Sequence, residues 1–208
     1  MNVRKRRATR LVKRLDVPVP ESEQSPESVL AKALGSDSAA DDAMREVETA
    51  FDLAPGSPRN VLAAMVLARI SSDLAAVARL LGWNEFEDFC ASVIAAAGYH
   101  VRVNVRLKKP TRQIDIVAES PSMVIAIDCK HWKRTLGEAG LLALAAAQQE
   151  RTRLLKRYSG SDKDHLPVVL TMLDSEVREV MGVAVVPLGA LRDFLASISR
   201  FDDNFEFV

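Results

Sequence analysis

The sequence from Tyr99 to Lys130, YHVRVNVRLKKPTRQIDIVAESPSMVIAIDCK, has the residue pattern of three consecutive β-strands. Apolar residues alternate with polar ones up to Leu107, which predicts a half-buried first strand. A Lys-Lys-Pro turn then leads to a second strand over 113–118, and a Ser-Pro-Ser connection leads to a third over 123–129. Three strands in direct succession favour antiparallel pairing.

Helical patterns surround these strands. Helices are predicted over 85–97, 137–158 and 188–198, and further strands over 168–173 and 183–186. Asn84 is the predicted N-cap of the first of these helices, and Gly98 its stop. Because the long middle helix allows a crossover, the strand after this helix is expected to pair in parallel with a strand before it. The order predicts an α/β fold with a mixed sheet flanked by helices.

The N-terminal part of the chain has a different character. Ser25-Pro26-Glu27 resembles a helix start, Asp41 is a candidate cap for a helix that reaches Phe51, and the segment 61–81 is expected to form two helices that divide at Ser71-Ser72-Asp73. The sequence Ala54-Pro-Gly-Ser-Pro58 breaks the pattern. We therefore predict a basic disordered arm over 1–24, an acidic helical linker over 25–57 and the main domain over 58–208.

The formal net charge of zero hides two opposed blocks. The first fourteen residues hold seven basic side chains and no acid, whereas residues 16–52 hold ten acids and two basic side chains. The basic arm either contacts DNA phosphates or is a solvated tail. The acidic stretch either folds onto the main domain or shields the arm.

Several classes of protein are excluded. The two cysteines, Cys90 and Cys129, are far apart and have no CxxC spacing, so we expect no disulfide framework and no structural zinc. Three charged residues interrupt the most apolar stretch, 61–81, and the basic N-terminus precedes no apolar signal region. We therefore expect a soluble cytoplasmic protein with no membrane partner.

Charged residues interrupt the second and third strands. Asp115 lies between two isoleucines, while Asp128 and Lys130 flank Cys129 on the same side of one strand. Such charges are costly inside a sheet unless they pair or bind a metal. Carboxylates suit Mg²⁺, and a lysine beside them can orient or help to deprotonate a water molecule. The alternative is a buried ion pair at a sheet edge.

These residues carry a resemblance to a known family. The segment 113–115 (Gln-Ile-Asp), followed by 127–130 (Ile-Asp-Cys-Lys), resembles the split Asp…(Asp/Glu)-x-Lys signature of PD-(D/E)XK nucleases. The segment 85–89 (Glu-Phe-Glu-Asp-Phe) resembles the "FE" helix of Mrr-type restriction endonucleases, and archaeal Holliday-junction resolvases share this layout. The resemblance covers residues 83–186 and implies a restriction-endonuclease-like αβββαβ core with a helical N-terminal extension.

The resemblance implies the parts of an active site. The catalytic residues would be Glu87, Asp115, Asp128 and Lys130, with Mg²⁺ (or Mn²⁺ as a substitute) held by the two aspartates, the Cys129 carbonyl and Glu87. Lys130 would act on the attacking water. If the helix is rotated by half a turn, Glu85 takes the place of Glu87. Alternatively, Glu87 is an exposed helix carboxylate and no part of the site. The chain departs from many Mrr-like relatives at Asp128, where they carry Glu or Gln, and at 108–112, where they carry glycines.

Other residues near this pattern have open roles. Basic residues that either contact DNA phosphates or cover a solvated strand face are Arg106, Lys108, Lys109, Arg112, Lys133 and Arg134. Trp132 either stacks on a base or packs beneath the next helix. Gln148 or Gln149 is a candidate polar active-site residue, because some relatives place one on this helix.

The function that the resemblance implies is that of a Mg²⁺-dependent endodeoxyribonuclease, which hydrolyses DNA phosphodiester bonds to restrict foreign or modified DNA. Two alternatives stay open: a repair or recombination nuclease similar to junction resolvases, and a catalytically inactive DNA-binding module of the same fold. A homodimer is a further expectation, because one such site cuts one strand.

Overall fold

The computed structural model describes residues 24–50, 58–71, 73–131, 137–172 and 178–198. The chain divides into two compact units, residues 1–92 and 93–208. The domain limits predicted at residues 24 and 57 stay predictions, and nearly all of the basic arm lies outside the described residues.

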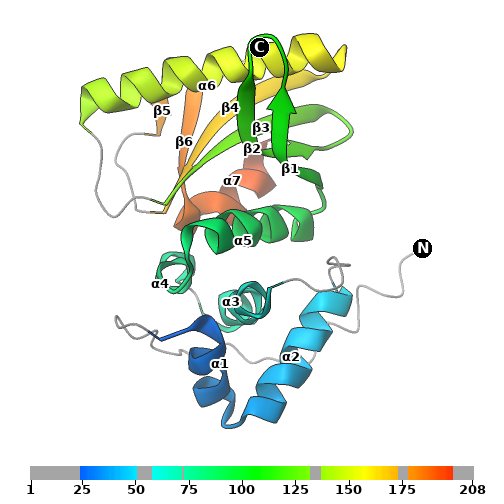
Figure 1. The fold of residues 1–208 in the computed structure, drawn as a ribbon, viewed down its shortest axis with the longest axis vertical. Helices are drawn as coiled ribbons and strands as arrows, with labels where there is room; N and C mark the ends of the chain where they lie inside the picture. The colour runs from blue at the N-terminus through cyan, green and yellow to red at the C-terminus, as the bar shows by residue number, and fades with distance from the viewer. Residues whose placement is uncertain (1–23, 51–57, 72, 132–136, 173–177, 199–208) are drawn as a thin grey trace. The chain divides into compact units, whose positions relative to one another are not determined.

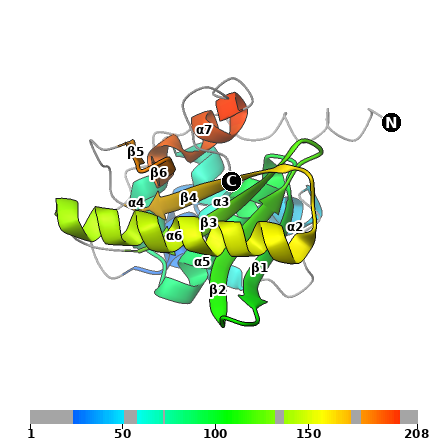
Figure 2. The ribbon, with the colours of Figure 1, turned by 90° about the horizontal axis from the view of Figure 1, so that it is seen from above.

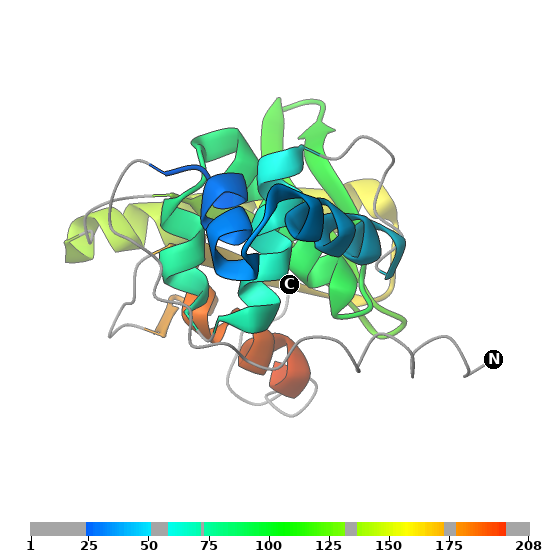
Figure 3. The same cartoon turned by 90° about the horizontal axis from the view of Figure 1, so that it is seen from below.

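The first unit consists of helices. They are α1 (Pro26–Leu34), α2 (Asp37–Ala50), α3 (Arg59–Ile70), α4 (Leu74–Arg79) and the first part of α5 (Trp83–Ala96). Figure 3 shows α1 and α2 in blue beside α3 in cyan. The Ser25 hydroxyl accepts the Ser28 N–H at the start of α1, as the Ser-Pro-Glu pattern predicted. The predicted division of 61–81 into two helices is also confirmed, with Asp73 as the N-cap of α4.

The predicted cap of α2 is wrong. The helix begins at Asp37, where the Ser36 hydroxyl accepts the Ala39 N–H, so Asp41 lies inside the helix. Its carboxylate instead pairs with Arg59 of α3, and this hydrogen bond lowers the pKa of Asp41. Arg59 also binds Glu27 of α1 at 2.6 Å, so one guanidinium joins three helices.

The start of α5 also differs from the prediction. The helix begins at Trp83, and Glu85 rather than Asn84 provides the capping contact. The Glu85 carboxylate accepts the Gly82 N–H at 2.9 Å with one oxygen and the Asn60 amide at 2.8 Å with the other. Both oxygens of Glu85 therefore accept hydrogen bonds within the first unit, and its place as the alternative metal ligand stays a prediction.

The second unit is built on a six-stranded mixed sheet (Figure 1). Its strands are β1 (His100–Leu107), β2 (Arg112–Glu119), β3 (Met123–Lys130), β4 (Asp164–Thr171), β5 (Glu179–Val180) and β6 (Val183–Pro187). They lie in the order β1-β2-β3-β4-β6-β5, with β1 to β3 antiparallel and β3, β4 and β6 parallel. With α5 and α6, these strands confirm the predicted αβββαβ core. The short strand β5 was not predicted, and β4 begins four residues earlier than expected.

One long helix, α6 (Glu138–Ser159), crosses a face of this sheet (Figure 2). Leu154 and Leu155 of α6 pack against Val117, Val124 and Ala126 of the central strands. A short 3-10 turn, η2 (Leu188–Ala190), leads from β6 into α7 (Leu191–Ser197), which contacts β6. Burial of these apolar side chains fixes α6 on the sheet, so a polar residue on the same face of α6 is held against β3.

The first strand is less buried than its alternation predicted. Val103 is 44% exposed, because β1 is an edge strand with a neighbour on one side only. Asn104 adopts a positive φ of 53°, a conformation that asparagine tolerates better than most residues, and its side chain accepts a hydrogen bond from Gln113. This residue interrupts the extended backbone, so the alternating valines do not form one continuous buried face.

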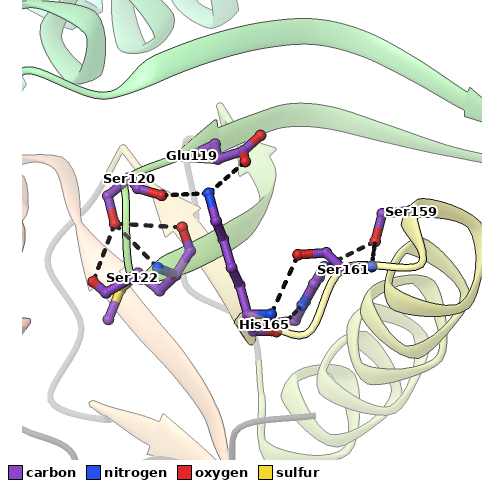
Figure 4. A network of polar contacts seen from close by, with 8 residues as sticks. Glu119, Ser120, Ser122, Ser159, Ser161 and His165 are labelled. Atoms are coloured by element: carbon purple, nitrogen blue, oxygen red, sulfur yellow. Dashed lines mark hydrogen bonds and ion pairs between the residues drawn. The ribbon is translucent and has the colours of Figure 1, made fainter.

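A polar network joins the β2–β3 hairpin to the start of β4 (Figure 4). The Lys163 ammonium lies 2.7 Å from a Glu119 carboxylate oxygen and donates to the Ser120 carbonyl at 2.9 Å. His165 is fully buried, with Nδ1 2.8 Å from the Lys163 carbonyl and Nε2 3.5 Å from the Ser159 hydroxyl. Since a carbonyl only accepts, Nδ1 carries the proton and the neutral ring is satisfied.

This histidine gives the fold a pH dependence. Burial lowers the pKa of His165 in the folded protein. The unfolded chain then binds the proton more readily, so stability is fully present above about pH 6.5 and falls as the pH drops through the folded pKa. We expect the free energy of unfolding to fall between pH 7.5 and 5, by up to about 1.4 kcal/mol per pH unit from this residue. Urea unfolding at several pH values gives the free energy of unfolding of the wild type and of His165→Gln. The difference between their two slopes against pH is the contribution of His165.

The exposed His100 provides the matched control, since His100→Gln should leave the slope unchanged. Equal slopes for the wild type and His165→Gln would contradict the assignment of this pH dependence to His165.

Candidate active site

Asp128, near the end of β3, is the most buried carboxylate of the predicted site, with an exposure of 4%. Two cations contact it. The Lys130 ammonium lies 2.8 Å from Oδ2, and Nη1 of Arg151 donates to Oδ1 at 2.9 Å. Lys130 reaches Asp128 along one side of the strand, as the alternation predicted. Arg151 comes from α6, which covers this part of the sheet.

Asp115 lies where the pairing of β2 with β3 stops. The last paired residues are Ile116 and Ile127, one position before the two aspartates. Beyond this point the Asp115 carboxylate accepts the main-chain N–H of Cys129 at 2.8 Å. Asp115 is thereby fixed next to the Asp128–Lys130 segment, and the structure brings these three predicted residues together.

The surroundings of Asp115 disfavour its negative charge. Burial raises the pKa of Asp115 most, and the hydrogen bond from Cys129 opposes this effect. The charge of Asp128 raises the pKa further, whereas Lys130 and Arg151 lower it. The net result is a raised pKa, so a charge at this position costs stability in the protein without a metal. A buried carboxylate with a raised pKa beside a second carboxylate is typical of functional sites.

A buried glutamine supports the arginine. Gln148 of α6 is fully buried; its amide donates to the Ala126 carbonyl of β3 at 2.8 Å, and its Oε1 accepts from Arg151 at 3.3 Å. Of the two candidate glutamines, Gln148 is thus connected to Asp128, whereas Gln149 donates to the Met181 carbonyl at the β5–β6 turn. Sequence reasoning missed Arg151. Its spacing of three residues from Gln148 was the available signal, because such residues share a helix face.

The predicted set also includes Glu87, several basic residues and Trp132. Glu87 is half-buried on α5 within the first unit, and its role at the metal stays a prediction. Among the predicted DNA-contacting residues, Arg106, Lys108 and Lys109 are exposed, and Arg112 lies 3.1 Å from Glu150. Trp132, Lys133 and Arg134 lie outside the described residues.

The donor set suits a hard divalent cation. Within the described parts of the chain, no group of three or more His, Cys, Asp or Glu side chains is arranged to hold a metal. Two adjacent carboxylates nevertheless offer the oxygen ligands that Mg²⁺ prefers. The buried Oδ2 of Asp128 forms an ion pair with Lys130 but accepts no hydrogen bond, so it keeps a lone pair for such a cation. Asp115 and Asp128 are the residues that would hold it.

Parts of the chain are similar to known proteins. Residues 78–155 match the Mrr_cat family, described as "Restriction endonuclease". An uncharacterised protein of Archaeoglobus fulgidus is 26% identical over 129 residues, which are 61% of this chain and 98% of that protein. The crystal structure of protein VC1899 from Vibrio cholerae aligns with a TM-score of 0.39 and 13% identity, over 85% of this chain and 52% of that one. This chain therefore spans about half of VC1899. In the described residues, no helix is long and apolar enough to cross a membrane.

Proposed function

Because residues 78–155 form a restriction endonuclease domain of the Mrr type, within the PD-(D/E)XK superfamily, we propose that this chain is a Mg²⁺-dependent DNA endonuclease that restricts foreign or modified DNA. One observation carries the proposal. Asp115 of β2 and Asp128 of the neighbouring strand β3 lie beside Lys130, inside the segment that matches the family.

The roles of the residues follow from their chemistry. Asp115 and Asp128 would hold Mg²⁺ or Mn²⁺, with Glu87 and the Cys129 carbonyl as further proposed ligands. A cation held there would polarise the phosphodiester and make the attacking water more acidic. Lys130 donates from Nζ, either to orient the attacking water or to stabilise negative charge on the phosphate oxygens. Lys130 is half-buried, and its ammonium lies 2.8 Å from Oδ2 of Asp128, which supports this role.

Basic side chains around the β1–β2 turn would hold the DNA. Arg106, Lys108 and Lys109 are exposed, and Arg112 follows the turn. Contacts between such residues and phosphates provide affinity without sequence selectivity. Lys133 and Arg134 are further proposed DNA contacts, and they lie outside the described residues. Two copies of the chain would cut both strands of a duplex, so we propose a homodimer on DNA.

One observation favours a second candidate, an inactive DNA-binding module of the same fold. Each carboxylate oxygen of Asp128 already has a cation beside it without any metal. A purely structural ion-pair cluster would look the same, and cleavage assays separate the two functions.

The experiment is a digestion panel with the full chain and Mg²⁺. Its substrates are a methylated plasmid, the same plasmid unmethylated, and a four-way DNA junction. We expect cleavage of plasmid duplexes, fastest on the methylated form, without preference for the junction. Preferential cutting of the junction would contradict the restriction function and favour a recombination nuclease. Binding of all three DNAs without cleavage, in Mg²⁺ and in Mn²⁺, would contradict the nuclease and favour the inactive module.

A further inference from the structure

The charges around the two aspartates balance without a metal. Asp115 and Asp128 carry two negative charges when ionised, and Lys130 and Arg151 carry two positive charges. Lys130 lies 2.8 Å and Arg151 2.9 Å from the Asp128 carboxylate, and the hydrogen bond from Cys129 holds Asp115 next to them. Only 5% of the Asp128 side chain is exposed, so water screens these charges weakly. A divalent cation added to this group would leave an excess of two positive charges.

Arg151 is held between Asp128 and Gln148. Its Nη1 donates to both side chains, and the Gln148 amide is itself bound to the β3 main chain. Lys130 forms an ion pair with Oδ2 of Asp128 at 2.8 Å. A divalent cation at the aspartates would therefore lie close to the positive charge of Arg151.

We propose that Arg151 is the resident counter-ion of Asp128 and that it weakens divalent-metal binding until DNA is bound. This inference rests on the proposed nuclease function. The fixed guanidinium repels a cation at the aspartates, and a DNA phosphate supplies the negative charge that offsets the excess. Metal and DNA therefore bind cooperatively, and each raises the affinity of the protein for the other. Such coupling would keep the site largely free of metal, and inactive, in the absence of its substrate.

The test is the Mn²⁺ affinity of the full chain without DNA, measured by calorimetry and by Mn²⁺ electron paramagnetic resonance. Removal of the fixed charge in Arg151→Gln should tighten Mn²⁺ binding about tenfold relative to the wild type. Arg151→Lys, which keeps the charge, should stay within about threefold of the wild type. Arg157→Gln is the matched control, because it removes the same charge from an exposed position on the same helix and should leave the affinity unchanged.

The sign of the change separates this role from a merely structural one. If Arg151 only held Asp128 in position, its replacement would weaken Mn²⁺ binding. Unchanged or weaker binding by Arg151→Gln would therefore overturn the proposal. If Arg151→Gln is unfolded without metal, Mn²⁺ should refold it, because the added cation replaces the lost counter-charge. Failure to refold at millimolar Mn²⁺ would likewise contradict the proposal.

The outcome also distinguishes this inference from the nuclease function. If the wild type binds Mn²⁺ and Asp128→Ala does not, the metal site stands whatever Arg151→Gln shows. If neither the wild type nor any Arg151 variant binds Mn²⁺ without DNA, the counter-ion role is overturned, whereas the metal-dependent nuclease is judged separately by plasmid cleavage in Mg²⁺.

Discussion

Lys130→Ala is expected to reduce Mg²⁺-dependent DNA cleavage by about 10²–10⁴-fold. The Lys130 ammonium forms an ion pair with Asp128 and lowers the pKa of Asp115, and alanine offers no replacement for its proton or its charge. Asp128→Ala should cause a loss at least as large, because it removes a proposed metal ligand. Initial rates of plasmid nicking under single-turnover conditions measure the effect.

Lys163 provides the matched control for this experiment. It is also a half-buried lysine in an ion pair, with Glu119, but it belongs to the network at the start of β4. Lys163→Ala should therefore keep the wild-type cleavage rate. Cleavage by folded Lys130→Ala within about threefold of the wild-type rate would contradict the catalytic role of this lysine.

Asp115→Asn is expected to change activity and stability in opposite directions. The substitution removes a proposed metal ligand charge, so cleavage should fall by about 10²-fold or more. It also removes a charge that burial disfavours, while the asparagine carbonyl can still accept the Cys129 N–H. The variant should therefore be more stable than the wild type without metal, by about 0.5–2 kcal/mol. Urea unfolding at pH 7 in a chelating buffer measures the gain.

Glu119→Gln is the control for this prediction, because it neutralises a carboxylate at the other end of β2. The ion pair with Lys163 lowers the pKa of Glu119, so loss of its charge should not stabilise the protein. A less stable Asp115→Asn with unchanged cleavage would show that the carboxylate is a structural group and not part of an active site.

The order of the core elements was predictable from the sequence. Alternation identified β1, and the apolar runs flanked by turn residues identified β2 and β3. The start of β4 was missed because His165 and Pro167 interrupt its apolar pattern, and proline is unusual inside a sheet. In the structure the pairing of β4 with β6 begins at Val168, so the missing N–H of Pro167 does not interrupt that ladder. The buried position of His165 depends on contacts with Lys163 and Ser159 that no local pattern shows.

The candidate site was only partly predictable, for a similar reason. Asp115, Asp128 and Lys130 were identified because a charge inside an apolar strand is costly without a partner. Arg151 was missed because it is one of several basic residues in the second half of α6, which resemble a solvated helix surface. Only the packing of α6 on the sheet distinguishes it from Arg157. The helix caps at Asp41 and Asn84 were misplaced because neighbouring residues in each segment have equivalent capping chemistry.

The most direct test of the central claim is the incubation of purified full-length protein with supercoiled plasmid DNA in Mg²⁺ and, in parallel, in excess chelator. Mg²⁺ should convert the plasmid to nicked and linear forms, and the chelator should prevent this completely. Intact plasmid after incubation with Mg²⁺ or Mn²⁺, or equal cleavage in the chelator, would contradict a metal-dependent nuclease built on Asp115, Asp128 and Lys130.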